Sequence, residues 1–303
     1  MRYRSIGHGC GIISALSLSL CGDPSRPRAS DWVGLIYAGL ENGVSGFDVR
    51  EADLALADGL REAFAGVDRN LAFVAWRLGK RPASAGGGQD FSAKALSDQV
   101  RAALSRTGLQ YLDAVMLDDP PAGEPSAEAM DALHQLKSAG LVRFLGLAGE
   151  GDAVDAHIEA GNFDILQTPF NLTSGWRERH RLRAAGASDM SAIGYRWFPD
   201  ALRRLAEAQI QAKPLRSRPL TASGTYAFLE STRGWRPEEI CLAYALTEPS
   251  LASVQARLSS PAEIERLAAV VDRDMPPGLA AQIEMARFSP ETAPVETRVA
   301  RRA

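Results

Sequence analysis

Short apolar runs alternate with longer amphipathic stretches along almost the whole chain, which is the pattern of successive strand–helix units. Strands in such units pair in parallel, because each intervening helix carries the chain back along the sheet. Eight apolar runs are predicted as strands, namely residues 15–20, 45–49, 71–77, 114–117, 143–146, 165–168, 192–196 and 253–257. Eight such units predict an α/β fold of the (β/α)8 type, a TIM barrel.

The stretches between the predicted strands carry ordinary helix signals, as one example shows. Ser126 is predicted as an N-cap, and the apolar residues Met130, Leu133 and Leu136 then recur on one helical face. Gly140 follows as a helix-terminating residue. These residues build the scaffold and carry no chemistry of their own.

Three segments break the alternation. Residues 81–90 contain three consecutive glycines after the third predicted strand, which predicts a flexible loop at the barrel's C-terminal rim. A phosphate-binding loop is the alternative, but the lysine and hydroxyl residue of a P-loop are missing. Residues 213–234 are polar and irregular. Residues 289–303, with two prolines and a basic end, predict a disordered tail after a barrel domain of residues 1–288.

Composition narrows the classes of function. The 303 residues are 46% hydrophobic, enough for a large core, and the formal net charge of −3 gives no reason to expect nucleic-acid binding. Cys10, Cys21 and Cys241 include no close-spaced pair, so we predict neither a disulfide framework nor a thiolate metal site. This cysteine usage is typical of a reducing cytoplasm.

One pattern near the N-terminus is similar to a secretory signal. Arg2 and Arg4 precede the apolar run 12–20, and Cys21 follows it. Serines interrupt the run, however, and Leu20 stands where a lipoprotein signal has a small residue. We therefore expect a cytoplasmic protein, and no stretch approaches the roughly 20 apolar residues of a membrane span.

Several short motifs occur in an order that points to one family. They are Ser14-Ala-Leu-Ser-Leu18, Gly46-Phe-Asp48, Leu109-Gln-Tyr-Leu-Asp113, Gly140-Leu-Val-Arg143, Gln167-Thr-Pro-Phe-Asn-Leu172 and Ser259-Ser-Pro261. Their order and spacing resemble the aldo-keto reductases over nearly the whole chain. The resemblance implies a barrel with an N-terminal β-hairpin cap and, in typical members, carbonyl reduction by a nicotinamide cofactor.

The resemblance also implies four catalytic positions at the barrel mouth, which are normally aspartate, tyrosine, lysine and histidine. Asp48 matches the aspartate. Asp53 stands at the tyrosine position, Arg77 at the lysine position and Asp118 at the histidine position. The chain is therefore similar to a degenerate member of the family, in which no catalytic tetrad is intact.

This loss has a chemical consequence, because hydride addition to a carbonyl leaves an alkoxide that must be protonated. Asp53 or Asp118 would donate that proton only if burial raised a carboxyl pKa far above its reference of ~3.9, and Arg77 acts in the opposite direction. Lys80 lies past the end of its predicted strand and is not expected to replace the donor. An Arg77 salt bridge to Asp48 or Asp118 is the favoured arrangement, and a new catalytic constellation of these charged residues is the alternative.

Cofactor binding is a separate question from catalysis. The resemblance implies that Gln167 holds the nicotinamide amide and that Tyr195 stacks on the ring, with Asp48 beside them. The family's serine–asparagine pair, which also holds the amide, is replaced by Ala148 and Gly149.

The phosphate and adenine positions are changed further. The family's phosphate-binding basic residue is Ser259 here, and its adenine-contacting pair is Arg266-Leu267. Loss of the basic residue favours NAD(H) over NADP(H), with Arg196 and Arg257 facing the pyrophosphate. Surface arginines without a ligand are the alternative, and no metal site is predicted.

Two classes of function follow. The favoured one is a pseudoenzyme that binds NAD(H) as a signal and binds other proteins through its surface. The alternative is an active NAD(P)H-dependent oxidoreductase with a non-standard proton donor. Inactive aldo-keto reductases include a regulator of bacterial cell division and the cell cycle, and this likeness implies the tubulin-like division GTPase and a histidine kinase as partners.

Overall fold

Eight parallel strands close into a barrel in the computed structural model, which describes residues 1–81, 86–200, 202–203, 226 and 228–287. Neighbours around the barrel follow the chain, and the last strand pairs with the first. The strands are β3 (Leu16–Cys21), β4 (Gly46–Arg50), β5 (Phe73–Leu78), β6 (Leu112–Asp118), β7 (Val142–Ala148), β8 (Ile165–Pro169), β9 (Ser191–Tyr195) and β10 (Leu251–Ala256). The predicted (β/α)8 fold is confirmed.

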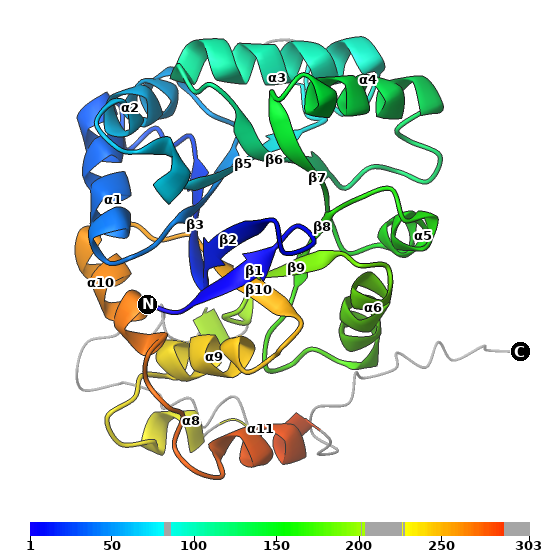
Figure 1. Cartoon of the computed structure of the whole chain (residues 1–303). Helices are drawn as coiled ribbons and strands as arrows, with labels where there is room; N and C mark the ends of the chain where they lie inside the picture. Colours follow the sequence, from blue (N-terminus) through cyan, green and yellow to red (C-terminus); the bar gives the residue numbers. More distant parts are fainter. Residues whose placement is uncertain (82–85, 201, 204–225, 227, 288–303) are drawn as a thin grey trace, which may run out of the picture.

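An antiparallel hairpin of β1 (Tyr3–Ile6) and β2 (Gly11–Ser14) lies across the N-terminal end of the barrel, as Figure 1 shows. Ile6 and Ile13 are fully buried and pack into an apolar cluster in the barrel interior with Phe144. Gly7 turns the hairpin at φ 62°, and an added Cβ would overlap the Phe144 ring. The predicted N-terminal cap is thus confirmed, and it closes this end.

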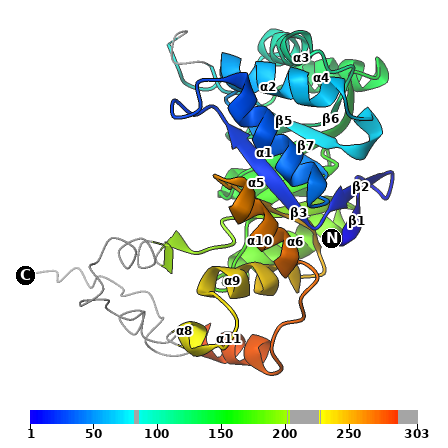
Figure 2. The ribbon, with the colours of Figure 1, turned by 90° about the vertical axis from the view of Figure 1, so that its left-hand side faces the viewer.

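Helices surround the barrel (Figures 1 and 2). They are α1 (Ala29–Glu41), α2 (Leu54–Ala65), α3 (Ala93–Thr107), α4 (Ala127–Ser138), α5 (Asp152–Ala160), α6 (Trp176–Ala187), α8 (Phe228–Ser231), α9 (Pro237–Leu246), α10 (Pro261–Val270) and α11 (Leu279–Arg287). Ser126 caps α4 as predicted, because its hydroxyl accepts a hydrogen bond from the Ala129 amide. Leu133 and Leu136 are buried as expected, and Gly140 adopts φ 72° just after the helix.

Some predicted strand ends were wrong by a few residues. The third predicted strand began at Leu71, but Arg69–Leu71 form a 3-10 turn capped by Asp68, and β5 starts at Phe73. The last two predicted strands included Arg196 and Arg257, which lie one residue beyond β9 and β10. Local backbone geometry, namely the 3-10 turn before β5 and the left-handed Arg196 after β9, sets two of these strand ends.

The three irregular segments are only partly described. Residues 82–85 of the glycine-rich loop lie outside the described part. The two sides of the loop are joined by hydrogen bonds from the Arg81 amide to the Gly88 carbonyl and from the Asp90 amide to the Gly79 carbonyl. Most of the segment 213–234 and all of the tail 289–303 lie outside the described residues. Within the part that is described, no helix is long and apolar enough to cross a membrane.

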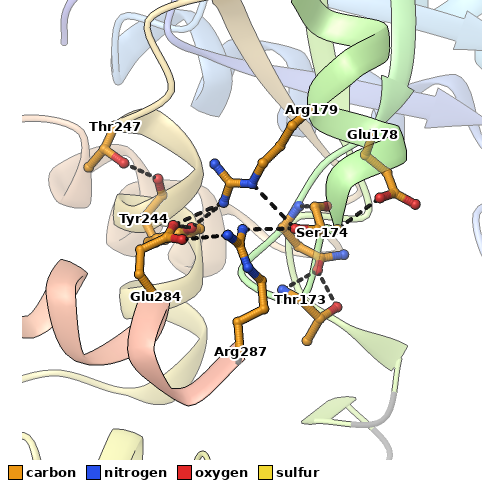
Figure 3. A network of polar contacts seen from close by, with 10 residues as sticks. Thr173, Ser174, Glu178, Arg179, Tyr244, Thr247, Glu284 and Arg287 are labelled. Carbon is orange, nitrogen blue, oxygen red and sulfur yellow. Dashed lines mark hydrogen bonds and ion pairs between the residues drawn. The ribbon is translucent and has the colours of Figure 1, made fainter. Parts of the chain in front are cut away.

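A polar network fastens α11, the last described helix, to α6 and α9 (Figure 3). Arg179 donates to the Tyr244 hydroxyl at 2.7 Å and to Glu284 at 3.0 Å, and the Tyr244 hydroxyl also donates to Glu284. Arg287 forms an ion pair with Glu284 at 2.8 Å and donates to the Ser174 carbonyl at 3.1 Å. Burial and the Glu284 contact raise the pKa of Tyr244 to about 12, so its hydroxyl stays a donor in this network.

Candidate functional site

A cavity of about 840 Å³ opens at the C-terminal ends of the barrel strands, at the end opposite the hairpin. Active sites of this fold lie at that end, because the loops after the strands are free to vary there. The lining includes Ser19, Arg50, Arg77, Lys80, Asp118, Tyr195, Arg196, Gln255 and Arg257. Of the candidate site residues, Asp48, Asp53 and Gln167 are not part of this lining.

Arg77 is the centre of the cavity floor. Its Nη1 donates to Asp118 Oδ1 at 2.6 Å, its Nη2 donates to Gln167 Oε1, and its Nε lies 3.4 Å from Asp48 Oδ2. The side chains of Arg77 and Asp48 are only 7% and 4% exposed. A guanidinium with its donors spread over three partners is held rigidly. The favoured salt bridge is present in the structure, to both aspartates at once.

The strand alternation explains why these side chains meet. Successive residues of a strand point to opposite faces, so inward positions recur every two residues. Asp48 on β4, Arg77 on β5, Asp118 on β6 and Gln167 on β8 all take inward positions near the strand ends. Apolar residues such as Ala75, Met116 and Ile165 precede them toward the hairpin, so the barrel interior is apolar near the hairpin and polar near the mouth.

Gln255 on β10 completes the floor and was not predicted. It is 5% exposed, and its Nε2 donates to Asp48 Oδ2. The available signal was an amide in the apolar run 253–257, but the partner lies 207 residues away in sequence. We term Asp48, Arg77, Asp118, Gln167 and Gln255 the floor cluster.

Asp53 is not part of the floor cluster, so the structure does not bring it into the charged constellation that the sequence left as an alternative. It is exposed and caps α2, accepting a hydrogen bond from the Leu56 amide at 2.8 Å. It also accepts from the Asp23 amide at 3.1 Å. The side chain serves the start of a helix at the rim, which is the ordinary role of an aspartate there.

Lys80 reaches the mouth although it lies beyond β5. Its Nζ is 3.0 Å from Asp118 Oδ2 and 3.2 Å from Glu51 Oε1. Burial alone would raise the pKa of Asp118, but the charges of Arg77 and Lys80 outweigh it and lower that pKa. The Asp118 contact raises the pKa of Lys80. Both groups therefore stay charged at neutral pH.

Three buried polar atoms of the floor cluster make no hydrogen bond in the described structure: Asp48 Oδ1, Arg77 Nε and Gln167 Nε2. Arg77 only donates, so Gln167 must present Oε1 to it and Nε2 elsewhere. A buried amide donor without a partner is costly unless water or a ligand satisfies it. The Gln167 Nε2 suits the carbonyl oxygen of a ligand carboxamide.

Tyr195 and Arg196 follow one another at the end of β9. Burial raises the pKa of the Tyr195 phenol, and the Arg196 guanidinium lies 5.6 Å from its ring centroid. Arg196 Nη1 is held by both carboxylate oxygens of Glu150 at 2.8 Å, and both side chains are half exposed. Arg257 is exposed at the end of β10 and forms no ion pair within the described residues. The two arginines therefore differ in availability to a ligand.

Backbone strain is concentrated at this mouth. Glu51, Asp119 and Arg196 each follow a barrel strand directly and adopt φ of 46°, 52° and 51°. Left-handed backbone is uncommon for residues other than glycine and is retained chiefly at binding and catalytic sites. All three residues line the cavity, which supports its assignment as the functional site.

Gly149 has no room for a side chain, because a neighbouring residue occupies the space. A Cβ there would lie 2.5 Å from Asp119 Oδ1 and 2.7 Å from Val154. The Asp119 carboxylate thus fills the space that a side chain at position 149 would need. Among the described residues no group of three or more metal-ligating side chains is gathered.

Sequence comparison decides the family. The profile described as "Aldo/keto reductase family" matches residues 50–286, which is well over half of the chain. This chain belongs to the aldo/keto reductase family. Most of the motifs that carried the resemblance lie within the matched residues.

Curated aldo/keto reductases match shorter stretches. An NADH-specific methylglyoxal reductase of Escherichia coli is 31% identical over 88 residues, 28% of this chain and 27% of that protein. An aldo-keto reductase of Fusarium vanettenii is 32% identical over 127 residues, 40% of this chain and 34% of that protein. The matches thus span about a third or less of these curated relatives.

Solved aldo/keto reductase structures share the fold. The holo form of AKR11C1 from Bacillus halodurans superposes with a TM-score of 0.77 at 17% identity, covering 98% of this chain and 99% of that chain. Its apo form gives a TM-score of 0.73 at 18% identity, with the same coverage. At such identity the likeness establishes the barrel and its cap alone.

Proposed function

We propose that this aldo/keto reductase family member binds NAD(H) at the barrel mouth as a signal and does not use it to reduce carbonyl compounds. The observation that carries the proposal is the Arg77 clamp. One guanidinium contacts Asp48, Asp118 and Gln167 where typical members place the groups that transfer the proton. Such a closed ionic cluster holds charge without exchanging protons.

The protonation states at the mouth support this view. A bound dinucleotide supplies a hydride, but the alkoxide formed would still need a proton donor. Asp118 has a lowered pKa and is ionised, while Lys80 and Tyr195 have raised pKa values and are weak acids at neutral pH. Arg77 stays protonated throughout. No one of these four groups matches the task of a general acid near pH 7.

Retained positions favour the dinucleotide. The unpartnered Gln167 Nε2 suits the nicotinamide carboxamide, and Tyr195 lines the cavity where its ring is available for stacking. Arg257 is free to meet the pyrophosphate, whereas Arg196 must first leave Glu150. Ser259 stands in place of the basic residue for a 2′-phosphate, which favours NAD(H), and the Escherichia coli relative is named for NADH.

The proposed role is regulation of bacterial cell division in the cytoplasm. The proposed partners are the tubulin-like division GTPase and a histidine kinase, and this part rests on the likeness to inactive family members that act on division. Bound dinucleotide would change the partner-binding surface only if it favoured one conformation of the chain. A pull-down of the purified GTPase with and without NADH tests this part directly.

An active oxidoreductase with a non-standard donor is the second candidate. The contact of Lys80 Nζ with Asp118 at 3.0 Å favours it, because a lysine ammonium in direct contact with the floor cluster can donate a proton, which a guanidinium does not do at neutral pH. The reductase names of the curated relatives point the same way.

Incubation of the protein with NADH or NADPH and a panel of aldehydes, ketones and quinones separates the two functions. We expect no cofactor oxidation above the rate without protein. Turnover that Asp48→Asn abolishes and that the exposed-site control Asp58→Asn leaves unchanged would contradict the proposal. Turnover lost in Lys80→Met would identify the alternative donor.

A further inference from the structure

Arg50 is the last residue of β4 and lines the mouth cavity. It follows Asp48 by two positions, so its side chain leaves the strand on the same inward side, one layer nearer the opening. The residue is half-buried. Its charge acts across the mouth on Asp118 and on the Tyr195 phenol.

The other cations of the cavity are mostly paired. Carboxylates lie within 4.0 Å of Arg77, Lys80, Arg196 and Arg203. Arg50 has neither an ion pair nor a hydrogen bond within the described part of the chain, and Arg257 at the rim shares this property. A half-buried, unpaired charge is unfavourable, because part of its hydration is lost without compensation. An anion from solution would supply the missing partner.

Further hydrogen-bond donors stand near Arg50. The strand register places Cys21 of β3 opposite Arg50, and Ser19, two residues earlier, opposite Asp48. The Ser19 and Tyr195 hydroxyls line the same cavity, and neither makes a hydrogen bond to another described residue. A guanidinium with hydroxyl groups close by is the usual composition of a carboxylate or phosphate site.

We propose that Arg50, with the hydroxyls of Ser19 and Tyr195, binds the carboxylate or phosphate group of a small metabolite at the mouth. This ligand is distinct from the dinucleotide, whose pyrophosphate is assigned to Arg196 and Arg257. Trp197, Phe198 and Leu258 line the same cavity and offer an apolar wall to the remainder of the ligand. The site does not depend on NAD(H) binding, so it is testable without the dinucleotide.

Calorimetric titration at low salt with two small anions tests this site. Malonate represents a carboxylate ligand, inorganic phosphate a phosphate ligand, and malonamide is the uncharged counterpart of malonate. We expect one of the anions to bind the wild type, malonamide not to bind, and Arg50→Gln to weaken binding at least tenfold. Arg50→Lys, which keeps the charge but not the planar fork, should lie between.

Arg101→Gln is the matched control, since Arg101 is exposed on α3 away from the mouth and should leave the affinity unchanged. Circular dichroism confirms that each variant is folded. The proposal is overturned if neither anion binds at millimolar concentration, or if Arg50→Gln and Arg50→Lys both bind as the wild type does. Loss of anion binding in Arg257→Gln but not in Arg50→Gln would also overturn it, because the anion would then occupy the pyrophosphate position.

Discussion

Arg77 decides the character of the mouth at the scale of single residues. Its side chain is 7% exposed and forms ion pairs with two buried carboxylates, Asp48 and Asp118. Linear motifs identified Asp48, Arg77 and Asp118 from sequence, because each stands at a fixed place beside a strand. The contacts of Gln255 with Asp48 and of Lys80 with Asp118 were missed, since contacts between different strands leave no local sequence pattern.

Replacing Arg77 by methionine should lower the free energy of unfolding by about 3 kcal/mol, because Asp48 and Asp118 would be left buried without their main partner. Denaturant unfolding measures this loss. The double variant Arg77→Met with Asp118→Asn should recover part of it, because one unpaired charge is removed. An Arg77→Met protein as stable as the wild type would contradict a stabilising role of the Arg77 ion pairs.

The lowered pKa of Asp118 predicts a pH dependence of stability. A carboxylate whose folded pKa lies below its unfolded value of ~3.9 stabilises the fold above that value and loses the contribution as pH falls toward the folded pKa. The stability difference between wild type and Asp118→Asn should therefore be constant near neutral pH and shrink below about pH 4. Denaturant unfolding at several pH values checks this. A stability difference that is still unchanged at about pH 2 would contradict it.

At the scale of elements, apolar runs located all eight barrel strands because a buried parallel strand must be apolar almost throughout. Their ends were less predictable. The 3-10 turn capped by Asp68 delays the start of β5, and the left-handed Arg196 follows the end of β9, features of local backbone geometry that hydrophobicity does not encode. The packing of α11 against α6 and α9 was likewise not predictable from sequence, because Arg179, Tyr244 and Glu284 come from three separate helices (Figure 3).

Glu284→Gln should loosen α11, because the carboxylate is contacted by Arg179, Tyr244 and Arg287. Glu284 is 38% exposed, so we expect the local stability of α11 to fall by only about 1 kcal/mol. Such a loss speeds opening of the helix about fivefold. Hydrogen exchange of the α11 amides measures it. Glu265→Gln, at an exposed position of α10, is the control, and equal exchange in both variants would contradict the network.

At the scale of the whole molecule, the hairpin closes one end of the barrel, and the mouth cavity of about 840 Å³ opens at the other. Strand count and the capping motif made this architecture predictable from sequence. The state of the mouth was predictable only in part, because the same four positions allow a salt bridge or a catalytic constellation until distances are known. The strained residues Glu51, Asp119 and Arg196 further mark that end as the functional one.

The most direct test of the account is a titration of NADH into the purified protein, followed by nicotinamide fluorescence and then by addition of carbonyl compounds in the same sample. We expect a saturable fluorescence change that Gln167→Ala weakens about threefold to tenfold, since one hydrogen bond is worth about 0.5–1.5 kcal/mol. Gln135→Ala, at an exposed position of α4, should bind as the wild type does. The bound NADH should then persist when aldehydes, ketones and quinones are added. No fluorescence change at millimolar NADH, or rapid oxidation of the bound NADH, would contradict the central claim that this barrel binds the cofactor without consuming it.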